Sequence, residues 1–316
     1  MASAAPPRPR TIVVGAGAIG GFVAARLMDA GWPCWVLARG ATLAALRAGP
    51  LVLEDDGLER RVHLQAIADA GEAAPADLAI VCVKSFDTAA AGRALAPALA
   101  PGAIVLSLQN GVDNPGVLAL ALPGARIGGV AVYLGCQRVA PNRVVRRPSR
   151  DPATGRLRDR LVGGPPGPAA DALRALGEAL DVSVEVVQRA AEALWGKLVA
   201  NASLNTVTAL GRARVGRVFA DPRAVALMLA LGREVEAVAA ALGVALPADA
   251  ASRYVADARR RLPPDGGSST LFDLEAGRRL ERDALVGAVV REGERLGVPV
   301  PVSRACDALL RLLEPA

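Results

Sequence analysis

The chain has 316 residues, of which 52% are hydrophobic and 3% aromatic, and its formal net charge at pH 7 is +6. This length exceeds one average domain and can bury a core without disulfides or metals, so we expect two domains. No apolar run reaches the length of a membrane span, four cysteines without metal-ligand spacing fit a reduced cytoplasmic protein, and scattered arginines with few aromatic residues argue against nucleic-acid binding.

The first 188 residues alternate strand-like and helix-like segments, which predicts an α/β fold with a Rossmann-type, doubly wound parallel sheet. Short apolar strands are expected at residues 11–14 and 34–37, with a helix from 18 to about 30 between them. A hairpin is expected at residues 51–64. Continuous apolar runs at 78–83 and 103–108, joined by a helix over 87–99, predict strands buried on both faces, and 126–133 is a further strand candidate.

The densest basic segment follows these strands. It contains Arg143, Arg146, Arg147 and Arg150. We interpret it as the solvated face of a hairpin rather than a nucleic-acid interface.

From residue 189 the sequence is rich in Ala and Leu with helical periodicity, which predicts an all-helical C-terminal domain over residues 189–316. One continuous helix is expected over 190–210. A second begins after the Asp221-Pro222 pair, an N-cap followed by a first-turn proline, and stops at Gly243. Shorter helices are expected at 248–262, 269–276 and 283–296, and a last one ends near 313.

The segment after the first strand has the spacing of a dinucleotide-binding turn. It reads Gly15-Ala16-Gly17-Ala18-Ile19-Gly20. The first glycine makes the tight turn, the second lets a pyrophosphate approach the backbone, and the third lets the helix pack on the strand. A purely structural glycine turn is improbable because a strand precedes the motif and a helix and a second strand follow it.

The end of the second strand favours NADP over NAD. An acidic residue there would hold the ribose hydroxyls of NAD, but the sequence reads Leu37-Ala38-Arg39-Gly40. Arg39 can pair with a 2′-phosphate. The alternative is an ordinary surface arginine.

The chain has only two lysines, and the first of them, Lys84, ends a strand run. Asn110 lies just past the next run. Ligands of doubly wound sheets bind outside the carboxyl ends of the strands, so both residues are expected on the rim that carries the glycine motif. For Asn110, a plain Asn-Gly turn is an equally good interpretation.

The second lysine, Lys197, is followed at four-residue intervals by Asn201 and Asn205, and Thr208 extends this stripe along one helix face. Asparagine is a poor helix former and only five occur, so we favour a ligand-facing surface over a solvated polar face. The single histidine, His63, lies in the hairpin. A lysine or water is therefore expected to donate protons.

Taken together and in order, these motifs resemble the ketopantoate reductase family along nearly the whole chain. Its marks continue with Gln109-Asn110-Gly111, Trp195-x-Lys197-x-x-x-Asn201-x-x-x-Asn205, Ser268-Ser269-x-Leu271-x-Asp273, Gly277-Arg278 and Glu281-x-Asp283.

The resemblance implies an NADP-binding Rossmann domain at residues 1–188, a helical substrate-binding domain at 189–316, and an active site between them. The implied reaction is reduction of 2-dehydropantoate to pantoate with NADPH, on the route to pantothenate and coenzyme A. Lys197 would be the general acid, with Glu281 supporting catalysis and cofactor binding. Lys84 and Asn110 would position cofactor and substrate, and Asn201, Asn205 and Ser269 would hold the substrate.

The sequence departs from the family pattern at Thr270, Phe272 and Arg282, where Met, Gln and Ile are usual. These departures bear on which 2-oxo acid is reduced. A paralogous reductase of another 2-oxo acid or carbonyl is therefore one alternative, and a non-catalytic NADP-sensing protein is a weaker one. The oligomeric state stays open, with a homodimer as one option.

Overall fold

The computed structural model describes residues 8–151, 154–164 and 166–314. The chain folds into two compact units. The first comprises Met1–Gln109 and Asn114–Ala190, and the second comprises Asn110–Asp113 and Ala191–Ala316. In the described part of the chain, none of the helices combines the length and the apolar character needed to cross a membrane.

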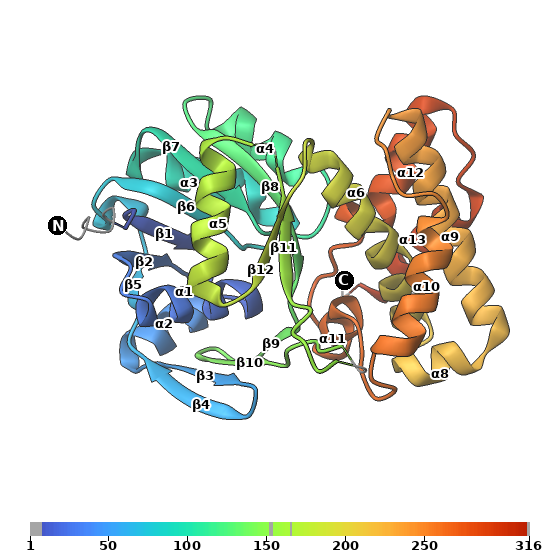
Figure 1. The fold of residues 1–316 in the computed structure, drawn as a ribbon, viewed down its shortest axis with the longest axis horizontal. Coiled ribbons are helices and arrows are strands. Elements are labelled where there is room, and N and C mark those ends of the chain that lie inside the picture. Colours follow the sequence, from blue (N-terminus) through green and yellow to red (C-terminus); the bar gives the residue numbers. More distant parts are fainter. Residues whose placement is uncertain (1–7, 152–153, 165, 315–316) are drawn as a thin grey trace. The chain divides into compact units, whose positions relative to one another are not determined.

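An eight-stranded sheet forms the centre of the first unit (Figure 1). Its parallel strands are β1 (Thr11–Val14), β2 (Cys34–Leu37), β5 (Gln65–Ile67), β6 (Ala76–Val81), β7 (Leu99–Ser107) and β8 (Arg126–Tyr133). They lie in the order β5-β2-β1-β6-β7-β8, which is the Rossmann order. Two short strands extend the sheet past β8. They are β11 (Arg160–Gly163), antiparallel to β8, and β12 (Ser183–Val186), parallel to β11.

Helices cover both faces of this sheet, which confirms the doubly wound prediction. Alternate strand residues enter different cores: Ile80 packs in a cluster with α1 (Ala18–Asp29) and α5 (Pro168–Leu180), whereas Val81 packs with α3 (Thr88–Leu95) and α4 (Asn114–Ala121). Figure 1 shows α5 lying over the strands. Burial on two faces explains why the strand sequences are continuously apolar. The helices α2 (Gly40–Ala48), α4 and α5 are not among the elements expected from the sequence.

A second sheet has the strand order β4-β3-β10-β9. Its strands are β3 (Leu51–Asp55), β4 (Leu58–Val62), β9 (Cys136–Ala140) and β10 (Arg143–Arg146). The expected hairpin is β3–β4, and it turns through Asp56 and Gly57, whose φ values are 52° and 81°. Positive φ at both central residues suits a two-residue hairpin turn.

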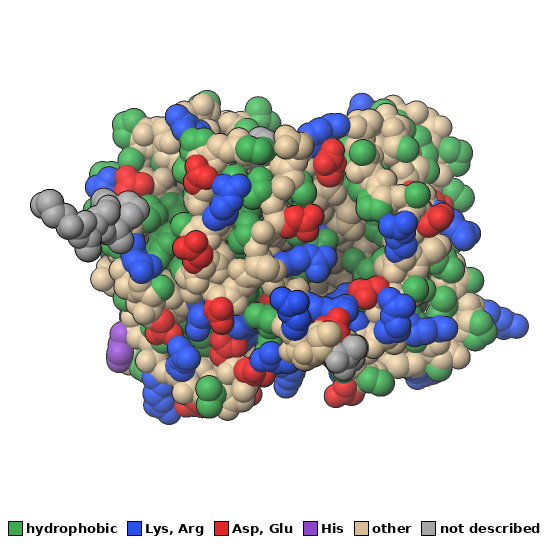
Figure 2. Space-filling model, viewed as in Figure 1, with side chains coloured by type: hydrophobic (Ala, Val, Ile, Leu, Met, Phe, Trp, Pro, Cys, Tyr) green, Lys and Arg blue, Asp and Glu red, His purple; other side chains and the backbone are tan. Residues whose placement is uncertain are grey.

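The interpretation of the basic segment as a solvated face is wrong for Arg146. Its side chain is 6% exposed, pairs with Asp55 at 3.0 Å and Asp159 at 2.9 Å, and lies 5.0 Å from the ring centroid of Phe22. A buried guanidinium needs such carboxylate partners. On the face drawn in Figure 2, basic side chains are mixed with acidic ones.

In the second unit, the described residues from 191 to 314 contain helices and turns and no strand. The helices are α6 (Ala190–Ala200), α7 (Thr206–Leu210), α8 (Val215–Ala220), α9 (Pro222–Ala241), α10 (Ala250–Arg261), α11 (Ser269–Glu275), α12 (Val286–Leu296) and α13 (Pro301–Leu313). Asp221 caps α9 by accepting a hydrogen bond from the Arg223 amide at 2.8 Å. This matches the N-cap expected from the sequence.

The prediction of one continuous α-helix over residues 190–210 is wrong. A π-helical turn, η4 (Asn201–Asn205), separates α6 from α7. The four-residue spacing of polar side chains fits an α-helix and a π-helix almost equally well, so the sequence pattern did not reveal the wider turn. Such turns occur frequently at functional sites.

Candidate functional site

The glycine motif forms the loop between β1 and α1, and two of its glycines are required by packing. Gly15 has φ +94°, and a Cβ there would lie 2.8 Å from Val83 Cγ1. A Cβ at Gly20 would lie 1.9 Å from the Gly15 carbonyl oxygen. Gly17 differs, because a Cβ there would meet nothing within 4 Å. The protein's own packing therefore does not explain Gly17, whereas a ligand approaching the backbone would.

The N-terminus of α1 adds to this loop. No side chain caps the helix, and its first turn carries no acidic residue. The amide groups of a first turn lack partners within their own helix, and together with the helix dipole they favour an anion. The residues present therefore fit the pyrophosphate of a dinucleotide.

Three loops follow neighbouring strands at this edge of the sheet. In the order β2-β1-β6, the strands are followed by Arg39, the glycine loop and Lys84. The strand order reverses between β1 and β6, and such a switch point is where doubly wound sheets bind their ligands. Lys84 is half-buried and has an extended backbone.

Arg39 directly precedes α2 after the end of β2, and its side chain is 80% exposed. Its guanidinium pairs with Asp87, in the turn η2 (Ser85–Asp87) after β6. An exposed ion pair of this kind contributes little to stability. The guanidinium can therefore exchange its carboxylate partner for a phosphate.

Cys82 packs beside the glycine loop, where a Cβ at Gly20 would lie 3.0 Å from the Cys82 Cβ. Burial raises the pKa of its thiol to about 12. A thiol of this kind is a packing group at neutral pH, because the thiolate is the reactive form.

In the second unit the polar stripe is not a solvated face. Asn201 and Asn205 are 6% and 8% exposed, and Thr208 is fully buried. The Asn201 amide donates to Asn110 Oδ1 at 3.2 Å. Asn110 thus meets the stripe within the second unit, and the positive φ of Gly111, 100°, shows that the same segment also turns sharply.

The stripe continues to the start of α11. The Asn205 amide donates to Ser269 Oγ at 3.4 Å, and the hydroxyls of Thr208 and Ser268 are 2.7 Å apart. Ser269 is exposed. Lys197 is half-buried in the last turn of α6. This arrangement offers an ammonium group, amides and a hydroxyl, which suit a carboxylate and a carbonyl oxygen.

Glu281 is also buried in this unit, with 8% of its surface exposed. The neighbouring Arg282 departs from the family pattern and has a structural explanation. Its guanidinium pairs with Asp307 at 3.0 Å on α13 and with Glu314 at 2.9 Å. These pairs anchor the Glu281 turn to the last helix.

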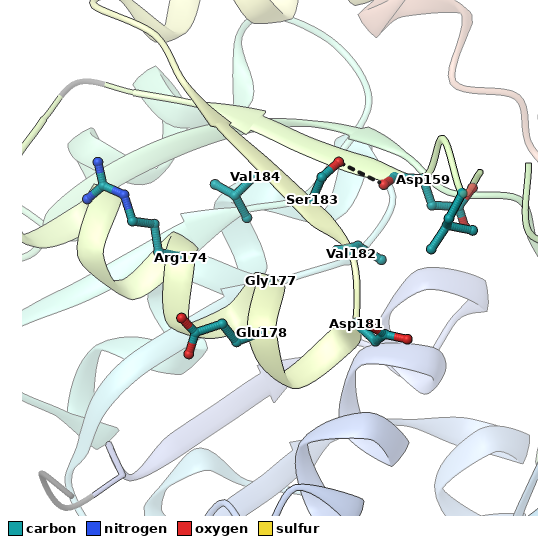
Figure 3. A pocket seen from close by; sticks show the side chains of 9 residues that line it. Asp159, Arg174, Gly177, Glu178, Asp181, Val182, Ser183 and Val184 are labelled. Carbon is teal, nitrogen blue, oxygen red and sulfur yellow. Dashed lines mark hydrogen bonds between the residues drawn. The ribbon is translucent and has the colours of Figure 1, made fainter. Parts of the chain in front are cut away.

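A hollow of about 410 Å³ elsewhere on the first unit contains none of these residues. It lies between the end of α5 and the start of β12, where Ser183 Oγ donates to the Asp159 carbonyl oxygen at 3.2 Å (Figure 3). The strands β11, β8, β7 and β6 separate β12 from β1. This hollow therefore lies away from the loops that follow β2, β1 and β6.

Three buried polar residues at or after the ends of β6 and β7 are not among the residues expected from the sequence: Thr88, Ser107 and Asn114. They are 1%, 2% and 3% exposed. Gln109 links Ser107 to Thr88, and the Thr88 hydroxyl donates directly to Asn114 Oδ1 at 2.7 Å. Asn114 is one of the five asparagines, so its rarity was a usable signal. The two hydroxyl residues carried no comparable signal.

Two family models match the chain. One described as "Ketopantoate reductase PanE/ApbA" matches residues 11–157, and one described as "Ketopantoate reductase PanE/ApbA C terminal" matches residues 189–314. The 2-dehydropantoate 2-reductase of Archaeoglobus fulgidus is 32% identical to the chain over 305 residues, which cover 96% of this chain and 98% of the relative. That of Mesorhizobium japonicum is 32% identical over 324 residues, covering 95% and 96%. A crystal structure of a PanE/ApbA family ketopantoate reductase from Ralstonia eutropha JMP134 is similar with a TM-score of 0.85 at 36% identity, covering 96% of this chain and 98% of that one.

Proposed function

The chain belongs to the ketopantoate reductase family, and from this premise we propose that it reduces 2-dehydropantoate to pantoate with NADPH, in the pathway to pantothenate and coenzyme A. The observation that carries the proposal is the set of loops after β2, β1 and β6. These loops bring Arg39, the uncapped N-terminus of α1 and Lys84 to the switch point of one sheet. The loop before α1 includes Gly17, whose Cβ position is unoccupied by protein atoms. Each group suits one part of a phosphorylated dinucleotide.

In this proposal the first unit binds the cofactor. The loop from Gly15 to Gly20 holds the pyrophosphate, and Arg39 exchanges Asp87 for the 2′-phosphate. Lys84 contributes a further positive charge at the rim. When bound, the nicotinamide supplies the hydride that reduces the substrate carbonyl carbon.

The second unit supplies the proton and holds the substrate. The ammonium group of Lys197 gives its proton to the carbonyl oxygen as negative charge develops there. Asn110, Asn201, Asn205 and Ser269 hold the carboxylate and hydroxyl groups, so that one face of the carbonyl is presented. Glu281 keeps the lysine protonated and supports the bound cofactor.

The test is NADPH oxidation followed at 340 nm with 2-dehydropantoate and a panel of other 2-oxo acids. Turnover is expected, with the highest kcat/KM for 2-dehydropantoate. A higher value for another 2-oxo acid would transfer the assignment to a paralogous reductase. Tight NADPH binding without turnover on any carbonyl would favour an NADP sensor instead.

One observation favours the paralogue as the second candidate. Phe272 is three residues after Ser269 on α11, so both side chains emerge on neighbouring positions of one helix face. The Arg214 guanidinium lies 5.5 Å from the Phe272 ring centroid. A phenyl ring where the family usually has Gln suits a bulkier or more apolar substituent on the 2-oxo acid.

We also propose a cytoplasmic homodimer. The four cysteines are free thiols, which suits a reducing compartment. Leu309 and Leu312 on α13 are 52% and 80% exposed. Leu309 borders a hollow of about 640 Å³ that apolar side chains of α7, α9 and α13 line.

Exposed leucines beside an apolar hollow suit a two-fold contact between copies. Light scattering after size exclusion should give the dimer mass, and Leu312→Asp should shift it to the monomer. A monomeric native chain at micromolar concentration would contradict this assembly.

A further inference from the structure

A buried network of side chains joins the loops after β6 and β7. The Gln109 amide nitrogen donates to the Val83 carbonyl oxygen at 3.0 Å and to Thr88 Oγ1 at 2.7 Å. Its amide oxygen accepts from Ser107 Oγ at 3.0 Å. All three bonds lie within the first unit.

The Thr88 hydroxyl is the junction of this network. It lies 2.9 Å from the Ser85 carbonyl oxygen and 2.7 Å from Asn114 Oδ1, which are both acceptors, and it accepts from Gln109. A hydroxyl has one proton to donate and two lone pairs. Replacing the hydroxyl by a methyl group therefore removes the acceptor of the Gln109 amide. The same change removes the donor that faces the Ser85 carbonyl and Asn114 Oδ1.

The network holds the peptide units on both sides of Lys84. Val83 and Ser85 are the residues before and after this lysine. The Val83 carbonyl oxygen accepts from the Gln109 amide, and the Ser85 carbonyl oxygen lies 2.9 Å from the Thr88 hydroxyl. The Lys84 carbonyl itself accepts from the Asp87 amide at 2.8 Å. Gln109 in turn directly precedes Asn110. One buried cluster thus fixes the backbone positions from which Lys84 and Asn110 project.

We propose that Thr88 and Gln109 are positioning residues for the proposed reaction, which act by clamping the Lys84 loop at the cofactor rim. The proposal rests on the function proposed above and adds residues that touch neither cofactor nor substrate. Thr88 is 1% exposed and Gln109 6%, so their side chains act through the backbone they hold. A buried polar group that loses its partner loosens the segment that depended on it.

The experiment compares three single variants of the full chain by NADPH titration. Thr88→Val keeps the shape and removes the hydroxyl, and we expect about tenfold weaker NADPH binding, or about 1.4 kcal/mol. Thr88→Ser keeps the hydroxyl and should bind within about twofold of the native chain. Equal weakening in both variants would overturn the proposal, because packing of the methyl group would then be the cause.

The matched control is Thr11→Val. Thr11 is also fully buried in the first unit and donates one hydrogen bond, to the Pro9 carbonyl oxygen at 2.9 Å, but it begins β1 at the opposite edge of the sheet. Removal of the Thr11 hydroxyl should lower the free energy of unfolding and leave the affinity for NADPH unchanged. Weakening equal to that of Thr88→Val would show a general structural effect and would contradict the clamp.

A double-mutant cycle with Lys84→Ala tests whether the effect passes through the lysine. In that background Thr88→Val should weaken NADPH binding by no more than about twofold, since the group that the clamp positions is gone. A full tenfold effect would contradict the proposal. At saturating NADPH and substrate, kcat of Thr88→Val should stay within about threefold of native, because Lys197 is untouched.

Hydrogen exchange separates failure of the clamp from failure of the proposed function. Without any ligand, amides of residues 83–88 should exchange faster in Thr88→Val than in Thr11→Val. A native chain that binds no NADPH would refute the proposed function, and the exchange result would still decide the clamp. Unchanged exchange would overturn the clamp even if NADPH binds.

Discussion

The proposed reaction requires different chemical properties of the two lysines. Lys197 must release a proton, which a guanidinium does not do at neutral pH, whereas Lys84 only needs a positive charge. We expect Lys197→Arg to lower kcat by about 10²–10⁴-fold, the usual contribution of a positioned general acid. Lys84→Arg is the control and should mainly raise the KM for NADPH. Near-native kcat in Lys197→Arg would assign that lysine a structural role.

Arg39 is the residue on which cofactor choice depends. A guanidinium–phosphate contact is worth about 1.5–3 kcal/mol, so kcat/KM should favour NADPH over NADH by at least about tenfold. Arg39→Ala should remove most of that preference. Arg47→Ala is the matched control and should leave the preference unchanged. Arg47 is a half-exposed arginine, lies in the last turn of α2 and pairs with Glu72 at 3.4 Å. Equal use of both cofactors by the native chain would refute this role.

At the scale of elements, the start of α11 holds adjacent serines with different contacts. Ser268 caps the helix by accepting from the Leu271 amide at 3.1 Å, whereas Ser269 is exposed and meets Asn205. Ser268→Ala should therefore cost about 1 kcal/mol of stability, the usual value of an N-cap. Ser269→Ala should instead raise the KM for the 2-oxo acid with little change in melting temperature. Thermal unfolding and steady-state kinetics of the pair will show whether the two effects separate.

Much of the element layout could be predicted because it follows from local patterns. The continuous apolar runs gave β6 and β7, and the Asp221-Pro222 pair gave the start of α9. The π-helical turn at Asn201–Asn205 could not be predicted in this way. A side-chain spacing of four residues does not distinguish the two kinds of turn.

The candidate site residues rest on a similar kind of local pattern. Lys84 and Asn110 were identified by their positions after strands, which the order of the chain alone supplies. The buried state of Arg146 was not predictable, because its partner Asp159 directly precedes a strand of the other sheet and comes beside it only in the folded protein. The Thr88–Gln109 contact depends on folding in the same way.

At the scale of the whole molecule, the buried cysteines should make the free energy of unfolding decrease as the pH becomes alkaline. Burial raises the pKa of the Cys34 and Cys82 thiols from 9.0 to about 12. Unfolded thiols ionise near pH 9 while the folded ones stay protonated, so this stabilisation is complete below pH 9 and is lost as the pH rises towards 12. The loss should approach about 1.4 kcal/mol per pH unit for each thiol.

Urea unfolding between pH 8 and pH 11 measures this slope. Cys34→Ala should lower stability at pH 8 and make the decline above pH 9 shallower. A slope that is unchanged in this variant would contradict the assignment to Cys34.

Residues Asn110–Asp113 belong to the second unit although the first unit precedes and follows them in the sequence. The chain therefore passes between the units three times, after residues 109, 113 and 190. Val112 packs against the cluster that contains Trp195, and Asp113 pairs with Arg291. A gene fragment that begins at residue 191 would lack these four residues. The helical half expressed alone is therefore expected to be less stable than the same unit in the full chain, because these contacts would be missing from it.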